Sequence, residues 1–112
     1  MKGMSTRKFT TGAIRDTEEG KEHFVECLSF LAMKRYGKYM LTCEGKYPPD
    51  NWRKGIPIKA YEQSLFRHLH KYFANKYEGS SFEPEIDHLG AMMFNLQGIM
   101  HEEEKQKLTE KL

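Results

Sequence analysis

Apolar residues recur at helical spacing through most of the chain beyond residue 17, and no stretch alternates in the way that a β-strand requires. A period of about 3.6 residues places side chains on one face of an α-helix, whereas a strand has a period of two. The pattern therefore predicts an all-α fold. With 112 residues, of which 38% are hydrophobic, the chain is long enough for one compact domain and too short for two.

Three stretches carry the helical pattern, and the third is apolar almost all round, so we expect it to lie at the centre of a bundle. Residues 41–57 contain glycines, prolines and no sustained period, which predicts a long irregular loop with room for a short helix. The predicted helices run from Glu18 to about Met40, from about Pro57 to Tyr77, and from near Pro84 past His101 into the charged tail.

The domain organisation follows from the same pattern. Residues 1–17 are polar and basic with little hydrophobic periodicity, so we expect an N-terminal arm, followed by a single helical domain over residues 18–112. Because the predicted helices are apolar on more than one side, three of them from one chain cannot cover each other. We therefore expect a homo-oligomer, either a dimer or a tetramer.

Charge and cysteine content exclude several classes of protein. The chain has 18 Lys and Arg against 16 Asp and Glu, a formal net charge of +2, which does not indicate a nucleic-acid-binding surface. Cys27 and Cys43 fit ordinary reduced thiols rather than a disulfide framework. No stretch resembles a signal peptide or a membrane span. We expect a soluble protein of the cytoplasm.

The second predicted helix places ionisable groups close to apolar ones. Glu62 shares a stripe with Phe66, Leu69 and Phe73, so we expect its carboxylate to face the core, where it needs a partner. His68 lies at the border of that face, and Arg67 falls on the polar side. The alternative is structural: a glutamate paired with a Lys or Arg, and a core histidine hydrogen-bonded to a carbonyl.

The third predicted helix has the same character. Asp87 and His88 lie near its start, and Asn95 lies among apolar neighbours, where an amide must satisfy several hydrogen-bonding groups. A carboxylate in the first turn is also favoured by the helix dipole, which gives Asp87 a structural alternative. The small residues Ala91 and Gly98 permit close helix approach or leave room for a flat ligand.

Carboxylates that project from facing helices are a common way to hold Mg²⁺ or Mn²⁺. The candidate metal ligands are Glu62 and Asp87, with Glu22 and Glu26 as additions from the first predicted helix. His68 and His88 could join a softer metal, although no spacing in the chain is a zinc signature.

Two further segments suit a nucleotide. The arm and its continuation offer Arg15, Asp16 and Lys21, and the long loop offers Asn51-Trp52-Arg53-Lys54-Gly55. Cationic side chains beside glycine suit phosphate, and Trp52 offers a stacking face for a base. The structural alternative for Trp52 is a plug that packs beneath the loop.

In order and spacing, these segments resemble a bacteriophage family, the dATP/dGTP diphosphohydrolase N-terminal domain, which is related in architecture to the MazG-like all-α nucleotide pyrophosphohydrolases. The resemblance covers about Thr11 to Glu104. It is carried by Gly12-Ala13-Ile14-Arg15-Asp16, Gly20-Lys21, Tyr36-Gly37-Lys38, Asn51-Trp52-Arg53-Lys54-Gly55, Ser64-Leu65-Phe66-Arg67-His68, Asp87-His88-Leu89-Gly90-Ala91 and Phe94-Asn95.

The resemblance implies a helical, often oligomeric enzyme that uses Mg²⁺ or Mn²⁺ to cleave a purine deoxynucleoside triphosphate between the α- and β-phosphates, with water as the nucleophile. It implies that His68, Asp87 and His88 line the site, together with the candidate substrate-binding residues Arg15, Asp16, Lys21, Asn51, Trp52, Lys54, Arg67 and Asn95. As a hydrolase, the chain would use Glu62 and Asp87 as the leading metal carboxylates, and His68 or His88 as proton acceptor or phosphate contact. These four are the candidate catalytic residues.

One departure from the MazG-like pattern keeps two alternatives open. Such enzymes carry Glu-Glu-x-x-Glu on one helix and Glu-x-x-Asp on the next. Residues 18–22 match the first string, interrupted by Gly20, and no Glu-x-x-Asp occurs anywhere in the chain. The first alternative is a phage protein that binds or sequesters a nucleotide or a nucleotide-derived defence signal without cleaving it. The second is a helical protein-interaction module.

Overall fold

A computed structural model gives the structure of residues 5–111. The expected architecture of three main helices is confirmed, as is a short helical turn in the long loop. The elements are β1 (Thr6–Lys8), β2 (Ile14–Asp16), α1 (Phe30–Thr42), the 3₁₀-helix η2 (Asn51–Lys54), α2 (Ile58–Tyr77) and α3 (His88–Glu110).

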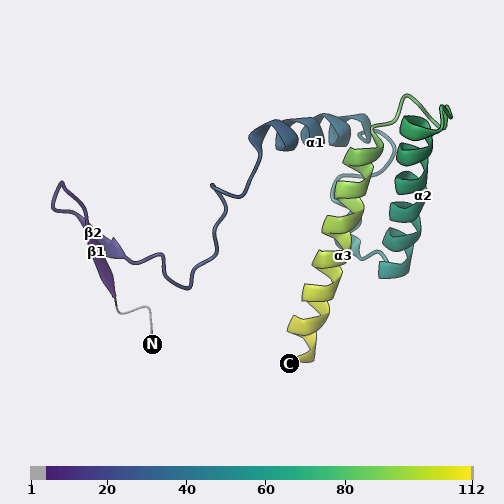
Figure 1. Ribbon diagram of the computed structural model, residues 1–112. Helices are drawn as coiled ribbons and strands as arrows, with labels where there is room; N and C mark the ends of the chain where they lie inside the picture. The colour runs from purple at the N-terminus through teal and green to yellow at the C-terminus, as the bar shows by residue number, and fades with distance from the viewer. Residues whose placement is uncertain (1–4, 112) are drawn as a thin grey trace.

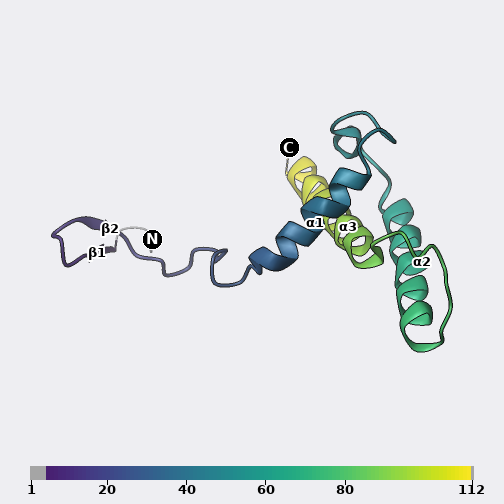
Figure 2. The same ribbon diagram turned by 90° about the horizontal axis from the view of Figure 1, so that it is seen from above.

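Helix α3 is the central element, as its apolar character predicted. It packs along α2 as an antiparallel pair, and α1 crosses over its N-terminal part (Figure 1). Seen from above, α1 and α2 lie on different sides of α3 (Figure 2). Among residues 5–111, no helix is both long enough and apolar enough to cross a membrane.

Small residues on α3 allow the close contact between helices. A Cβ added at Gly98 would lie 2.3 Å from the Tyr61 ring, and one added at Gly90 would lie 2.6 Å from Cβ of Tyr39. Both distances are far below van der Waals contact. The space beside Gly98 is therefore filled by an aromatic side chain, which supports close helix packing rather than a slot for a flat ligand.

The first predicted helix is wrong over its N-terminal half, because α1 begins at Phe30 rather than Glu18. Ser29 caps it by accepting a hydrogen bond from Ala32 N at 3.1 Å, and this cap fixes the start of the helix. The preceding residues form turns and extended chain, and Gly20 has a φ of 78°, which breaks a helix. Glu22 and Glu26 therefore do not share a helical face.

The expectation that the chain has no strands is also wrong. β1 and β2 form an antiparallel hairpin in which Arg7 lies opposite Arg15. Gly12, with a φ of 92°, supplies the left-handed conformation at the turn. Each strand has only three residues, which is too short for a period of two to be visible in the sequence.

Glu62 does not face the core, contrary to the expectation from its apolar stripe. Its own side chain is exposed, and Phe66 and Phe73 keep 67% and 45% of their surface exposed. Helix α2 has two apolar faces, and the one that packs on α3 contains Tyr61 instead. The sequence showed the stripe correctly but could not show which of the two faces α3 would cover.

Candidate functional site

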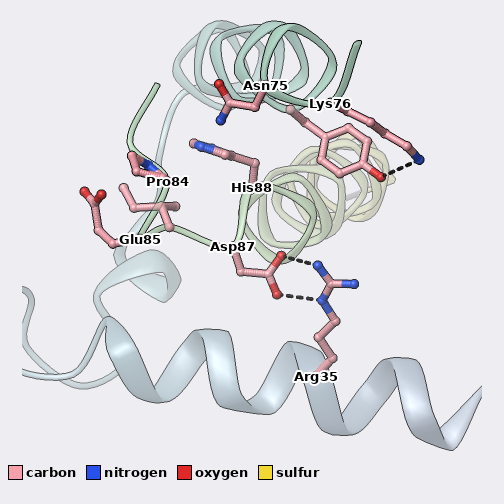
Figure 3. A pocket seen from close by; sticks show the side chains of 9 residues that line it. Arg35, Asn75, Lys76, Pro84, Glu85, Asp87 and His88 are labelled. Carbon is pink, nitrogen blue, oxygen red and sulfur yellow. Dashed lines mark hydrogen bonds and ion pairs between the residues drawn. The ribbon is translucent and has the colours of Figure 1, made fainter. Parts of the chain in front are cut away.

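A hollow of about 460 Å³ lies where α1, α2 and the start of α3 meet, beside the turn that joins α2 to α3 (Figure 3). It combines two cationic side chains, two carboxylates and an imidazole, which is a set suited to a polar, charged ligand. It is lined by Arg35, Tyr72, Asn75, Lys76, Pro84, Glu85, Ile86, Asp87 and His88.

Arg35 and Asp87 form a two-pronged ion pair across this hollow. Nε of Arg35 donates to Oδ2 of Asp87 at 2.8 Å, and Nη2 donates to Oδ1 at 2.9 Å. The hydrogen bonds from Arg35 lower the pKa of Asp87 below its ordinary value, so the carboxylate stays ionised at neutral pH. Oδ1 also accepts from Gly90 N at 3.3 Å, which caps α3. Asp87 thus links α1 to α3 through the ion pair, and it is the N-cap residue of α3.

His68 and His88 form a direct pair between α2 and α3, with their Nδ1 atoms 2.8 Å apart. Nε2 of His88 lies 3.1 Å from the carbonyl oxygens of both Phe82 and Glu83. Carbonyl oxygens only accept, so this nitrogen must carry the proton. Neutral His88 then has a bare Nδ1, which accepts a hydrogen bond from Nδ1–H of His68.

This arrangement leaves Nε2 of His68 as the bare nitrogen of the pair and therefore as its proton acceptor. Burial, followed by electrostatic interaction with His88 and Lys71, lowers the pKa of His68, so the neutral ring is favoured. Both nitrogens of His88 are already engaged, so His88 orients His68 rather than accepting a proton itself. The structural alternative considered for His68, a hydrogen bond to a carbonyl, belongs instead to His88.

The turn that borders the hollow is held by side chains of α2. Asn75 donates to the carbonyl of Phe82 at 2.9 Å and accepts from its N–H at 2.8 Å. Lys71 forms an ion pair with Glu83. Lys76 lies at the rim with its Nζ 3.3 Å from the hydroxyl of Tyr72, and this hydrogen bond raises the pKa of Lys76. The rim therefore carries a persistent positive charge.

The arm holds a second hollow, of about 440 Å³, on the hairpin side of the molecule. It brings together Arg15, Asp16 and Lys21, which were predicted from sequence as substrate-binding residues, and adds Arg7 and Glu18. Arg7 pairs with Glu18 at 2.8 Å, and Nζ of Lys21 lies 4.0 Å from Asp16. In Figure 1 the hairpin lies away from the helices, so within one chain the two hollows are separate.

The remaining predicted residues lie in other places. Asn51, Trp52 and Lys54 are in η2, where the Trp52 ring packs edge-on against His101 with centroids 4.9 Å apart. Asn95 is buried between helices and donates to Ser64 Oγ at 3.1 Å and to the Ala91 carbonyl at 3.0 Å. These contacts satisfy the Asn95 amide nitrogen.

The predicted carboxylate ligands are not assembled within one chain. Glu62 is exposed on α2, Glu22 and Glu26 are exposed in the segment between β2 and α1, and both oxygens of Asp87 are engaged by Arg35. Among residues 5–111, no three His, Cys, Asp or Glu side chains form a group that could hold a metal ion. Arg67 is also exposed, on the outer side of α2.

Sequence reasoning missed the residues that complete the first hollow. Arg35, Tyr72 and Lys76 carry no motif, and Arg35 is 52 residues away from Asp87 along the chain. Of these three residues, only Tyr72 could have been linked to the site from sequence, because it shares a helical face with His68 at an offset of four.

Comparison with known protein families shows which family the chain belongs to. The profile of the family described as dATP/dGTP diphosphohydrolase, N-terminal, matches residues 10–111. The chain belongs to this family. No curated protein and no solved structure matches it. The matched region includes β2, the segment between β2 and α1, and the helices α1, α2 and α3, so both hollows lie largely within the family's domain.

Proposed function

We propose that this protein is a pyrophosphohydrolase of purine deoxynucleoside triphosphates. The observation that carries the proposal is the family match over residues 10–111, since the family is described as a dATP/dGTP diphosphohydrolase domain. The hollow beside the α2–α3 turn supports it, because Arg35 and Lys76 supply positive charge and His68 supplies a proton acceptor nearby. The ligand is then a purine nucleotide.

In the proposed reaction, water adds to the α-phosphorus and the bond from the α-phosphorus to the bridging oxygen of the β-phosphate breaks. The products are a deoxynucleoside monophosphate and pyrophosphate. Nε2 of His68 takes the proton of the attacking water, and His88 holds His68 in the tautomer that leaves this nitrogen bare. Cations at the rim balance the charge on the departing pyrophosphate.

The family resemblance also implies Mg²⁺ or Mn²⁺, which would polarise phosphate oxygens. The residues of a single chain do not fit this ion well, because Asp87 is paired with Arg35 and Glu62 lies on the outer side of α2. We therefore assign no step to the metal. Metal dependence is a separate question for the assay.

The test is release of pyrophosphate from dATP and dGTP by the purified protein, with Mg²⁺, with Mn²⁺ and with a chelator. The expected result is release of pyrophosphate in the presence of a divalent ion, with loss of activity in His68→Gln. Lys46→Gln, at an exposed loop position outside both hollows, is the control and keeps full activity. If no common nucleotide is converted with either ion, the hydrolase assignment fails.

A second candidate function is nucleotide binding without turnover. The observation that favours it is the two-pronged pair of Arg35 with Asp87, which engages both oxygens of a carboxylate that catalysis would need as a ligand. A binder returns intact nucleotide when the complex is denatured, whereas an enzyme returns the monophosphate. Mass spectrometry of the released ligand separates the two.

We also propose that the protein works as a homo-oligomer. Among residues 5–111 the buried apolar side chains are only Tyr61, Ala74 and Ala91, which is a small core for a helical domain. Large apolar side chains stay exposed on each of the three main helices, for example Leu31 on α1, Phe66 on α2 and Met100 on α3. Apolar faces of this kind are normally covered by another subunit.

A further inference from the structure

The N-terminal part of the chain reaches away from the helices. β1 and β2 pair with each other, and residues 17–29 run as turns and extended chain to the start of α1. Both views show the hairpin at the far end of this connection, well separated from α2 and α3 (Figures 1 and 2). We call residues 5–29 the arm. Such a shape is typical of segments that dock on a neighbouring subunit.

The arm has apolar side chains that need a cover. Phe24 and Val25 keep 65% and 71% of their surface exposed, and Leu28 keeps 45%. Helix α2 has an apolar stripe that also lacks a cover, formed by Phe66, Leu69, Phe73 and Tyr77 at helical spacing. The same chain therefore carries two uncovered apolar surfaces that could bury each other between copies.

Charge complements this apolar match. The hairpin, residues 5–16, has three basic residues and one acidic residue, whereas the α2–α3 turn, residues 78–87, has four acidic residues and no basic one. Lys71 and Arg35 pair with Glu83 and Asp87. Within residues 5–111 no ion pair is recorded for Glu78 or Glu85. A basic hairpin placed beside this turn is electrostatically favourable.

The hairpin also offers an unused donor. Nε of Arg7 is buried and has no hydrogen-bond partner among residues 5–111, and such a group normally finds an acceptor. Arg15 lies opposite Arg7 in the hairpin and lines the same hollow. Arg7 already pairs with Glu18 of its own chain, whereas the structure of residues 5–111 gives Arg15 no ion pair. Arg15 is therefore the cation that suits an anionic group from outside its own chain.

From these observations we propose that the arm of one copy docks on a second copy, with Phe24, Val25 and Leu28 on the apolar stripe of α2 and the hairpin beside the α2–α3 turn. Arg15 and Lys21 of one copy then contact the phosphates of a nucleotide held in the other copy's hollow. The ligand in this statement rests on the proposed function. Each site is therefore built from two chains, and neither hollow is complete alone.

Mixing two variants tests this arrangement. Arg15→Glu damages the arm and Lys76→Glu damages the hollow, so each variant alone should bind dATP at least about tenfold more weakly than the wild type. After subunit exchange in an equimolar mixture, random pairing joins an intact arm to an intact hollow in about a quarter of the sites. Calorimetric titration should then recover about a quarter of the wild-type binding sites.

Recovery of no binding sites would overturn the proposal that the two chains share each site. If the arm instead acted on the hollow of its own chain, every site in the mixture would carry one of the two substitutions. Lys46→Glu, which changes an exposed charge outside both hollows, is the matched control and should keep wild-type binding when alone. If the wild type binds neither dATP nor dGTP, the proposed function has failed, and a second experiment decides where the arm docks.

That experiment places a photo-crosslinking phenylalanine analogue at position 24 in otherwise intact protein. A mixture of isotopically heavy and light chains distinguishes crosslinks within a chain from crosslinks between chains. The proposal requires heavy–light products that map to residues 66–87 of the other copy. Crosslinks that remain within one chain, or that map elsewhere, overturn it regardless of whether a nucleotide binds.

Discussion

At the scale of single residues, the His68–His88 pair makes stability depend on pH. The pKa of His68 is lowered from its ordinary 6.5, first by burial and then by electrostatic interaction with His88 and with Lys71, with Arg67 adding to the effect and Glu83 opposing it. As the pH falls below 6.5, the unfolded chain binds a proton at His68 before the folded chain does. The free energy of unfolding should therefore decrease from pH 6.5 down to the folded-state pKa.

The measurement is urea unfolding between about pH 7.5 and 5 for the wild type, His68→Gln and His70→Gln. His68→Gln should have a shallower pH dependence than the wild type. His70 is exposed on the same helix and provides the control, so His70→Gln should keep the wild-type slope. An unchanged slope in His68→Gln would contradict the proposed origin of this dependence.

Asp87 has two structural roles that two substitutions can separate. Asp87→Asn keeps an oxygen that can cap α3 through Gly90 N but loses the ion pair with Arg35. Because Arg35 is largely exposed, this loss should cost only about 0–1 kcal/mol. Asp87→Ala removes the cap as well and should cost about 1 kcal/mol more in urea unfolding. Ser29→Ala removes only the cap of α1 and calibrates that increment. Equal costs for the two Asp87 variants would show that the cap contributes nothing.

The sequence identified some site residues and could not identify others, for a physical reason. Asp87 and His88 were found because charged or polar groups beside an apolar helix need partners. Their partners, Arg35 and the Phe82 carbonyl, were not predicted. A surface arginine on α1 looks like any solvated cation until the fold brings α1 across α3. The chemistry of a residue is local, but its partner depends on how the helices pack.

At the scale of the elements, the contact between α2 and α3 depends on Gly98. A methyl group there would overlap the Tyr61 ring, so Gly98→Ala should destabilise the protein by about 1–3 kcal/mol. Gly37 in α1 is the matched control, because an added Cβ meets nothing within 4 Å. Gly37→Ala should instead stabilise the helix by about 0.5–1 kcal/mol. Thermal unfolding of both variants measures the difference, and a neutral Gly98→Ala would contradict the tight packing.

The helix boundaries show what periodicity can predict. The bounds of helix α2 are almost as expected, because Pro57 marks the start and the turn at Gly79 marks the end of a continuous apolar pattern. The predicted start of the first helix was wrong because Phe24 and Leu28 continue the apolar period into a segment that is not helical. The capping signal at Ser29 was present in the sequence, but the longer apolar pattern outweighed it. In the proposed assembly these apolar residues contact a second subunit, and in sequence such residues look the same as those that pack a helix.

At the scale of the whole molecule, the exposed apolar surface predicts that folding and assembly are linked. If copies bury Phe66 and Phe73 against each other or against an arm, the midpoint of thermal unfolding should rise with protein concentration. The wild type should also show a mass above 13.2 kDa in light scattering. Phe66→Ser with Phe73→Ser should lower both the mass and the concentration dependence. Arg67→Ser, on the exposed polar side of the same helix, is the control and should change neither. A wild type that stays monomeric with a constant midpoint over about a hundredfold range of concentration would contradict a homo-oligomer.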